Sequence, residues 1–478
     1  MKIDRFRVVK LIANEIKSHL EGPRVRDIIG LSSSDDRLYS YCDLLTHACS
    51  ECFRSYLDNI YWFDGFRWSW FDRHDVVLEL AINEALASLG VAKKDLLKGR
   101  TRLVASAKSG AYLSPMNVSP VVVGFRNGVW DFSDIDNPVY HPWKDRMPIT
   151  DLLSYDYVPE ADCPVWRMFL GMVLTKPQQV MLQKFLGLGC VDRKRMTHRI
   201  EETLWLVGEG GNGKSTIFEV VKAVFGADNL SYMPLGHIVT SNVDLRMRNI
   251  GRMAGKIFNY CSEIQADDIT RSSDTFKSLC SGEPQEVRSI AKDSWTVYDI
   301  PFFIFNMNKM PVNRSLDRAF MRRLLVIDFS TTVRKEDMDR ELVNKLLAEL
   351  PGIRNWCIEG YRMLMADEYR FNLSESDTEA LRRYEFENGQ SVKLFCEDNG
   401  YRSKKYAGKW SEKPHYVAAA NVYRDYVSYC EKNGVEPMND NLFGRAMTGL
   451  KFSKEKYSGS IIYSIFCDRA VKDELKIR

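Results

Sequence analysis

The sequence predicts an α/β protein with a mainly parallel sheet, and two observations carry this prediction. First, strand-like and helix-like segments alternate from about residue 200, in the order "TLWLV", "KSTIFEVVKAVFG", "GKIFNYCSE", "SSDTFKSLCSG", "PFFIF" and "RRLLVIDF". Apolar strands separated by helical segments are typical of a parallel sheet covered on both faces. Second, a glycine-rich loop joins the first of these strands to the first helix.

This loop, "GEGGNGKST" at residues 208–216, has the spacing of a phosphate-binding loop. Such a loop wraps its backbone N–H groups around the phosphates of a nucleotide, and the lysine reaches the outer phosphates while the following hydroxyl meets Mg²⁺. We expect the nucleotide to contact Gly208, Glu209, Gly210, Gly211, Asn212, Gly213, Lys214, Ser215 and Thr216. We also expect Lys214 to face solvent in the empty site. Taken alone, the loop fits a kinase, a GTPase, a transporter motor or a helicase.

Length and composition are those of an ordinary globular protein. The chain has 478 residues, which suggests two to four domains, with 45% hydrophobic and 27% charged residues. No apolar run approaches the length needed to span a bilayer, and charges interrupt the first 20 residues, so we expect an intracellular protein. The net charge of +3 is too small to indicate nucleic-acid binding without local clustering of basic residues.

Eleven cysteines raise the question of a metal site. The tightest group contains Cys42, His47, Cys49 and Cys52, but its spacing matches no usual structural zinc site. The segment also has a helical pattern, in which cysteine is a small core residue. We therefore favour reduced, buried thiols over zinc.

Other segments predict hairpins and helices around the central sheet. The aromatic stretch "IYWFDGFRWSWFD" predicts a hairpin turning at Asp64-Gly65, for packing rather than for stacking on bases. Residues 118–132 predict a second hairpin, turning at Asn127-Gly128. Helices are expected near 164–174 and 176–187, and again between about 336 and 388.

The C-terminal segment predicts a DNA-binding unit. Two helices are followed by two strands around Ser458-Gly459-Ser460, which is the winged-helix pattern. Lys451, Lys454 and Lys456 lie on the hairpin side and are the expected DNA contacts. The alternative is a winged helix that serves only protein contacts.

Polar residues follow the later strands of the expected sheet. Glu263 ends one strand, where a carboxylate can polarise water and approach Mg²⁺ beside the loop. Most such motors have two adjacent acids here, whereas this chain has Ser262 before Glu263. The next strand brings Asn306 and Asn308 to the same edge, where an amide can bond the γ-phosphate or the attacking water.

Arg322 and Arg323 open the last strand of the series. They lie far from the loop in sequence, which suggests a finger that serves a neighbouring subunit. The alternative is that both arginines pair with local acids.

Five ordered motifs together resemble the superfamily 3 helicases. They are "GEGGNGKST", "NYCSEI", "FKSLCSGEPQEVRSIAKDSW", "FNMNKMP" and "DRAFMRRLLVIDF". The resemblance is closest to the phage, plasmid and poxvirus primase–helicase family and covers roughly residues 55–478.

The resemblance implies an AAA+ core that assembles as a hexameric ring, with ATP and Mg²⁺ held between subunits. Lys214 and Ser215 would bind phosphates and Mg²⁺, and Glu263 would activate water and approach the metal. Asn308 would take the sensor role, and Arg322 or Arg323 would reach the next subunit's site.

The family also implies a pore hairpin that grips one DNA strand. Here that hairpin is the segment from Arg288 to Trp295, with Lys292 at its tip. Only about 115 residues precede the "NGVWDF" region, so the primase half of the family is not expected. A separate primase or other replication protein is the expected partner.

We therefore predict an N-terminal helical domain (1–115), a helical region before the motor (116–195), the AAA+ domain (196–385) and a winged-helix domain (386–478). The predicted function is an ATP-dependent ring helicase that replicates a phage, plasmid or other mobile element in the cytoplasm of a bacterial host. The alternatives are an origin-binding initiator or loader that binds DNA without unwinding it, and an ATP-dependent defence or packaging factor.

Overall fold

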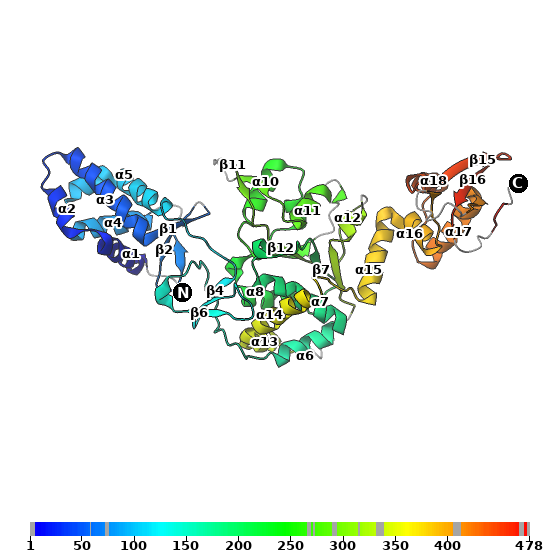
Figure 1. The fold of residues 1–478 in the computed structure, drawn as a ribbon, viewed down its shortest axis with the longest axis horizontal. Coiled ribbons are helices and arrows are strands. Elements are labelled where there is room, and N and C mark those ends of the chain that lie inside the picture. Colours follow the sequence, from blue (N-terminus) through cyan, green and yellow to red (C-terminus); the bar gives the residue numbers. More distant parts are fainter. Residues whose placement is uncertain are drawn as a thin grey trace.

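The computed structural model describes residues 5–57, 59–71, 76–264, 269–270, 273–288, 294–313, 316–330, 339–404, 413–467 and 473–475, with the side chains of 262–264 excepted. Figure 1 shows a helical N-terminal unit, a central unit built on a sheet and a smaller C-terminal unit, arranged along the long axis of the molecule. Within these residues no helix is both long and apolar enough to cross a membrane.

The N-terminal unit packs helices around a core of their own. Its helices are α1 (Arg5–His19), α2 (Gly22–Ile29), α3 (Ser34–Cys52), α4 (Val76–Ser88) and α5 (Lys93–Tyr112). Buried residues of α1, such as Ile12 and Ile16, recur at helical spacing and face α4. Cys49 and Cys52 are buried in the same core. No group of three or more metal-binding side chains occurs among the described residues.

A three-stranded antiparallel sheet follows α3 and contains the predicted aromatic hairpin. Its strands are β1 (Phe53–Tyr56), β2 (Asn59–Phe63) and β3 (Trp68–Trp70). Phe63 pairs with Trp68, so the connection has four residues rather than the two-residue turn expected at Asp64-Gly65. The Asp64 carboxylate accepts hydrogen bonds from the N–H groups of Phe66 (3.0 Å) and Arg67 (2.9 Å), which stabilises the longer loop.

A second small sheet and two helices lead into the central unit. The elements are β4 (Val122–Phe125), β5 (Gly128–Asp131), β6 (Val139–His141), α6 (Pro164–Val173) and α7 (Lys176–Gly187). Phe125 pairs with Gly128, so the hairpin turns one residue earlier than predicted. Thr175 and Gln178 form a capping box that starts α7, as the sequence indicated for this helix.

The central sheet has five strands, all parallel, which confirms the predicted α/β class. The strands are β7 (Thr203–Val207), β8 (Leu230–Ser231), β9 (Phe258–Ile264), β12 (Phe302–Met307) and β13 (Leu324–Asp328). Their order across the sheet is β13-β7-β12-β9-β8. β7 therefore lies between the last two strands in sequence, and its residues are buried on both faces, as expected for a parallel sheet covered by helices.

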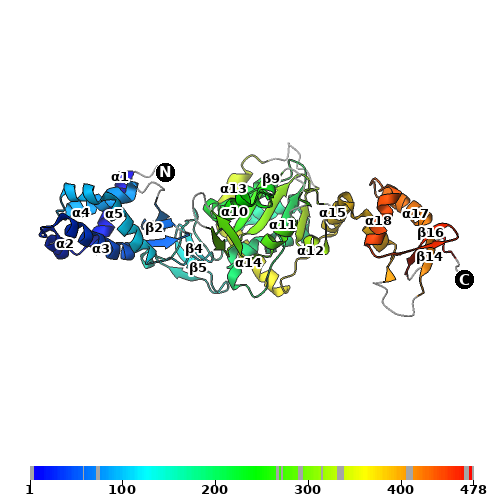
Figure 2. The ribbon, with the colours of Figure 1, turned by 90° about the horizontal axis from the view of Figure 1, so that it is seen from above.

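Helices cover both faces of this sheet (Figures 1 and 2). One face packs against α6, α7, α8 (Lys214–Phe225), α13 (Leu342–Ala348) and α14 (Leu350–Ala366). The other face packs against α9 (Leu235–Ile238), α10 (Val243–Gly251), α11 (Ser273–Cys280) and α12 (Arg318–Met321). The first core also takes in residues from 121 to 190, so the small β4–β6 sheet and the helices after it share one apolar interior with the central sheet.

A separate two-stranded hairpin lies beside α10, where the sequence predicted the pore hairpin. Its strands are β10 (Gln285–Arg288) and β11 (Ser294–Val297), and Arg288 pairs with Ser294. Arg288 is exposed and lies 3.4 Å from the Asp244 carboxylate. The tip, residues 289–293, lies outside the described residues, and so does Lys292.

The C-terminal unit has its own apolar core and the element order that the sequence predicted. Its elements are α16 (Ser391–Asp398), β14 (His415–Ala418), α17 (Ala419–Lys432), α18 (Asp440–Gly449), β15 (Ser453–Tyr457) and β16 (Ser460–Ile465). Tyr457 pairs with Ser460 across a two-residue turn in which Ser458 and Gly459 both have positive φ. β14 is an additional strand that pairs with β16.

Asp377 joins the helix that leads to the C-terminal unit to the edge of the central sheet. It lies in α15 (Glu375–Glu385) and is fully buried. Its carboxylate accepts hydrogen bonds from Gln178 Nε2 (2.7 Å) and from the backbone N–H of Asp328 (3.0 Å), the last residue of β13. It also accepts a bond from the Ser374 hydroxyl in the capping box that starts α15.

We predict that Asp377→Ala lowers the free energy of unfolding by about 3 kcal/mol, because the change leaves buried donors on three elements without an acceptor. Glu379→Ala, an exposed acid on the same helix, should change it by less than about 0.5 kcal/mol. Chemical denaturation of both variants measures the difference. Equal stabilities would show that α15 is held to the sheet by its apolar contacts alone.

Candidate nucleotide-binding site

The glycine-rich loop lies between β7 and α8 at the carboxyl edge of the central sheet, where the motif requires it. Gly208, Gly211 and Gly213 have φ values of 151°, 79° and 89°, which side chains larger than glycine rarely adopt. A Cβ on Gly213 would lie 3.0 Å from the Phe169 ring, and one on Gly208 would lie 2.8 Å from a backbone oxygen of Phe329. The loop is therefore closed from behind by protein and needs glycine for two separate reasons.

The front of the loop has the features of an anion site. The N–H groups of the first turn of α8 have no acceptor within the helix, and the helix dipole adds positive potential there. Ser215 is exposed in this first turn, and Gly210 has nothing within 4 Å of its Cβ position. The Nδ2 atom of Asn212 is buried with no hydrogen-bond partner. These donors fit a phosphate chain, and Ser215 fits a place beside Mg²⁺.

Lys214 does not face solvent, contrary to the prediction. Its side chain is only 5% exposed and donates to the backbone oxygens of Gly208 (2.5 Å) and Glu209 (3.0 Å) and to Asn212 Oδ1 (2.8 Å). Burial lowers the pKa of its ammonium group. The ammonium takes the oxygens of its own loop as acceptors, because a buried cation without partners is costly.

Strand register brings the other predicted residues to the same edge. Val207 aligns with Met307, and Met307 aligns with Ile264, so the ends of β7, β12 and β9 form one row. The N–H of Gly208 donates to the backbone oxygen of Met307 (3.2 Å), and the exposed Asn308 follows directly. The Glu263 backbone lies two strands from β7, about 10 Å at the usual strand spacing.

Asn306 lies on the same face of β12 as Ile304, whose side chain belongs to the core beneath α8. It is buried, unlike Asn308. Of the two amides predicted at this strand end, Asn308 is therefore the one open to a ligand.

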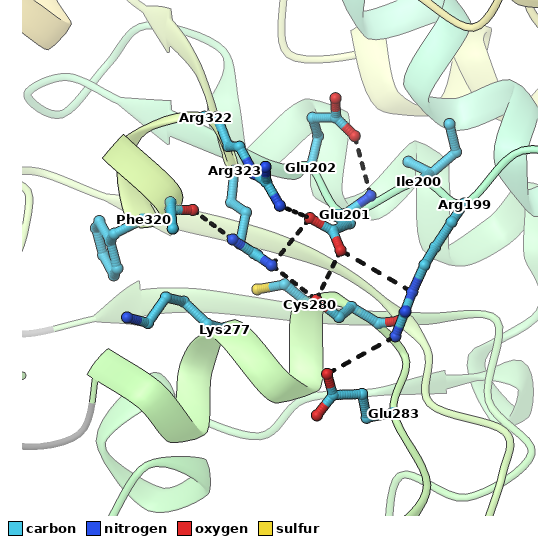
Figure 3. A network of polar contacts seen from close by, with 12 residues as sticks. Arg199, Ile200, Glu201, Glu202, Lys277, Cys280, Glu283, Phe320, Arg322 and Arg323 are labelled. Atoms are coloured by element: carbon cyan, nitrogen blue, oxygen red, sulfur yellow. Dashed lines mark hydrogen bonds and ion pairs between the residues drawn. The ribbon is translucent and has the colours of Figure 1, made fainter. Parts of the chain in front are cut away.

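The two arginines have different environments, although the sequence analysis did not distinguish them. Both precede β13 and therefore lie at the amino edge of the sheet, opposite the loop. Arg322 is 61% exposed, and its Nη2 lies 2.7 Å from Glu201 Oε2. Arg323 is 6% exposed and donates to the Ser281 hydroxyl (2.8 Å), the Ala319 backbone oxygen and the same Glu201 oxygen (2.9 Å). Figure 3 shows both guanidinium groups directed at this carboxylate.

Glu201, which the sequence prediction missed, organises this cluster. Burial alone would raise its pKa, but the Ser281 hydroxyl and the guanidinium groups of Arg323 and Arg322 outweigh burial, so the pKa is lowered. The carboxylate therefore stays ionised at neutral pH. Both arginines thus pair with a local acid, as the alternative expected. They differ in exposure, because the donors of Arg323 point into the protein whereas Arg322 remains 61% exposed.

The predicted C-terminal DNA contacts are all on the surface. Lys451, Lys454 and Lys456 are exposed, and the two lysines of β15 lie on one side of this edge strand. Lys454 Nζ also lies 5.9 Å from the centre of the Tyr463 ring. Lysines on an exposed edge strand also prevent edge-to-edge pairing with the sheet of another molecule, so the same pattern has an explanation without DNA.

The comparisons with known proteins are limited. A family model described as "Family of unknown function (DUF5906)" matches residues 206–323, from the end of β7 to Arg323. No curated protein matches. An apo structure of the NrS-1 C-terminal region is similar with a TM-score of 0.41 and 14% identity, over 65% of this chain and 77% of that one. An A-form apo structure of that region is similar with a TM-score of 0.36 and 13% identity, over 73% of this chain and 100% of that one.

We predict that Gly213→Ala lowers stability by about 1–3 kcal/mol, because alanine must adopt a left-handed conformation against the Phe169 ring. It should also weaken binding of a fluorescent ATP analogue at least tenfold. Gly210→Ala is the matched control, since its Cβ meets open space, and it should leave the unfolding midpoint unchanged. If both variants behaved alike, loop shape would not govern binding.

We also predict that alanine substitutions of the two arginines lower the free energy of unfolding by different amounts. Arg323→Ala should lower the free energy of unfolding by about 3 kcal/mol, because it removes the buried partner of Glu201 and Ser281. Arg322→Ala should cost at most about 1 kcal/mol, as expected for an exposed ion pair. Thermal unfolding of the two variants measures the difference between these losses. A larger loss for Arg322→Ala would mean that Arg322 is the structural member of the pair.

Proposed function

We propose that this protein is an ATP-driven, ring-forming AAA+ helicase of the superfamily 3 type that acts in replication of a phage, plasmid or similar element. The observation that carries the proposal is the strand order. The loop-bearing strand β7 lies inside the sheet, next to the edge strand β13, and β12, with Asn308 at its end, lies between β7 and the strand that bears Glu263. The strand order supports a role for the Asn308 amide between the proposed phosphate site and the strand of Glu263.

The roles in the site follow from this arrangement. The loop amides and Lys214 would bind the phosphates of ATP, and Lys214 would exchange its loop oxygens for phosphate oxygens. Ser215 and Glu263 would hold Mg²⁺, which neutralises charge that develops on the phosphates. Glu263 would orient and polarise the attacking water, and Asn308 would bond that water or the γ-phosphate.

The position of Arg322 supports action between subunits. It lies at the amino edge of the sheet, and the loop lies at the carboxyl edge of the same strands, separated by the length of β7, about 17 Å at 3.3 Å per residue. An exposed guanidinium so placed cannot serve its own loop. In a closed ring it would face the loop of a neighbouring copy and supply positive charge to the transition state. We assign the finger role to Arg322 and a structural role to Arg323.

Two surfaces would contact DNA. The β10–β11 hairpin stands apart from the central sheet, with the exposed Arg288 at the end of one strand. With Lys292 in the tip between the strands, a ring of such hairpins would present cations to the phosphates of a single strand in the pore. The C-terminal unit, in which two helices precede a hairpin with Lys454 and Lys456, supports a winged helix that binds duplex DNA at the fork.

The C-terminal unit also supports the second candidate, an origin-binding initiator or loader that does not unwind DNA. Its lysines are compatible with DNA binding by either protein. The hairpin favours the motor, because a switch has no need of cations inside a ring.

The test of the proposal is strand displacement on a forked duplex with ATP and Mg²⁺. The protein should unwind the fork, and Glu263→Gln should bind ATP and fail to hydrolyse it, because the amide keeps the shape and loses the base. ATP hydrolysis and DNA binding without displacement would support the initiator instead.

Mixing inactive variants tests the shared site. We predict that Arg322→Ala and Lys214→Ala each abolish DNA-stimulated ATP hydrolysis, and that a mixture of the two recovers part of it, because mixed rings contain some intact loop–arginine pairs. A finger arginine contributes about 10³–10⁵ in rate in related chemistry, so recovery is readily measured. Mixed rings that form and stay inactive at every ratio would show that Arg322 acts within its own chain.

A further inference from the structure

A cavity of about 710 Å³ lies on the side of the central sheet opposite the glycine-rich loop. Its walls come from residues 117–124 and 149–153, from the segment 191–200, and from residues 254–257 and 298–300 that precede β9 and β12. None of residues 208–216 lines it. The cavity is therefore distinct from the proposed ATP site, at the opposite end of the same strands.

A buried, unpaired arginine forms part of its wall. Arg354 lies in α14 and is 1% exposed, and its Nε and Nη2 atoms have no hydrogen-bond partner. The guanidinium lies over the rings of Phe132 (5.3 Å) and Phe225 (5.4 Å). No carboxylate within the described part of the chain forms an ion pair with it. Because arginine does not lose its proton in proteins, the positive charge remains.

The titratable groups around Arg354 do not supply the missing negative charge. Its neighbours are two thiols, Cys190 and Cys357, and two phenols, Tyr155 and Tyr157. Burial raises the pKa of all four groups, so each is neutral at physiological pH. A buried charge without a counter-ion is costly, and a site that keeps one is organised to receive an anion.

The rest of the lining carries more cations than carboxylates. The other cationic residues are Arg193, Lys194, Arg195, Arg199 and Lys256, and the carboxylates are Asp151, Asp192, Asp228 and Asp299. Three of these carboxylates are paired: Lys194 pairs with Asp299 (2.6 Å), Arg195 with Asp192 (3.6 Å), and Arg67, which is outside the lining, with Asp151 (3.5 Å). Arg199 lies 4.0 Å from the carboxylates of Glu201 and Glu283. Arg354, by contrast, has no ion pair with any carboxylate in the described part of the chain.

The size and the apolar part of the lining indicate more than a free inorganic ion. A volume of about 710 Å³ is in the range of pockets for small organic ligands. Phe225, Phe302 and Tyr56 contribute aromatic surface. Burial raises the pKa of Tyr56 to about 12, so its hydroxyl remains a hydrogen-bond donor.

We propose that this cavity binds a nucleotide through its phosphate, with Arg354 as the counter-ion and the aromatic wall as the contact for the base. Arginine suits this role because its planar fork bonds two phosphate oxygens at once. The phosphate can belong to a free nucleotide or to the 5′-phosphorylated end of a DNA strand. The inference is independent of ATP hydrolysis at the glycine-rich loop.

Isothermal titration of the full chain with dAMP tests the site. The wild type and Lys214→Ala should bind equally, because the second variant removes only the loop lysine. Arg354→Met should weaken binding at least tenfold, and Arg354→Lys should weaken it partly, because a lysine keeps the charge and loses the fork. Arg362→Met is the matched control on the same helix, since Arg362 is partly exposed and pairs with Asp136 (2.8 Å) outside the cavity lining. This variant should bind dAMP as the wild type does.

Two further ligands test what the cavity recognises. Deoxyadenosine tests the need for a phosphate, and a 5′-phosphorylated pentathymidine distinguishes a DNA strand end from a free nucleotide. Deoxyadenosine should bind at least tenfold more weakly than dAMP, because it lacks the phosphate. Equal or tighter binding of the phosphorylated strand would assign the site to a strand end, and its failure to bind would assign it to a free nucleotide. The proposal is overturned if dAMP does not bind, if it binds only where Lys214 is intact, or if deoxyadenosine binds as well.

Thermal unfolding without ligand gives a second readout. Because Arg354 has no counter-ion in the empty cavity, Arg354→Met should unfold at the same temperature as the wild type or higher, whereas dAMP should raise the midpoint of the wild type alone. If Arg354→Met is clearly destabilised, Arg354 has a structural role. In that case the dAMP affinity of Arg354→Lys tests the proposal. An affinity equal to that of the wild type would overturn it.

Discussion

Parallel pairing of β7 with β12 and β13 determines where the glycine-rich loop, Asn308 and the two arginines lie relative to one another. Val207 aligns with Met307 on one side and Asp328 on the other, so the strand ends form a straight row. The glycine-rich loop begins one residue beyond that row, and its first N–H is bonded to β12. A shift of one residue in this pairing would turn Asn308 to the other face and separate it from the loop. The site thus depends on backbone hydrogen bonds that contain none of its side chains.

Much of this arrangement could be predicted from the sequence because it has local causes. Glycine spacing, strand-length apolar runs and capping residues such as Thr175 act within a few residues, and they located the strands of the core and the helices beside them. Turns were less predictable. The Asp64 hairpin has a longer loop than its Asp-Gly pair suggested, because the carboxylate bonds to two later N–H groups and makes a wider connection stable.

The residues that sequence reasoning missed act over long separations. Glu201 binds arginines more than 100 residues later, Asp377 bonds Gln178 from another helix, and Arg354 reaches rings from two distant segments. The exposed Lys214 expected from the motif is buried, because oxygens of its own loop accept hydrogen bonds from the ammonium. None of these contacts leaves a periodic pattern, and only the fold brings their partners together. The pair of acids before β7, Glu201 and Glu202, was the one local signal available for Glu201.

The position of the loop and Arg322 at opposite ends of one sheet has a mechanical consequence. Its strands are packed on both faces, and such an interior is as dense as an organic crystal and resists compression. The separation between phosphate cradle and exposed guanidinium is then a fixed length within each copy. In the proposed ring, the fit of Arg322 to the proposed ATP site of a neighbouring copy would vary only with the angle at which whole subunits meet. Each copy would behave as a rigid lever, so a small rotation at one contact would be carried undiminished to the next.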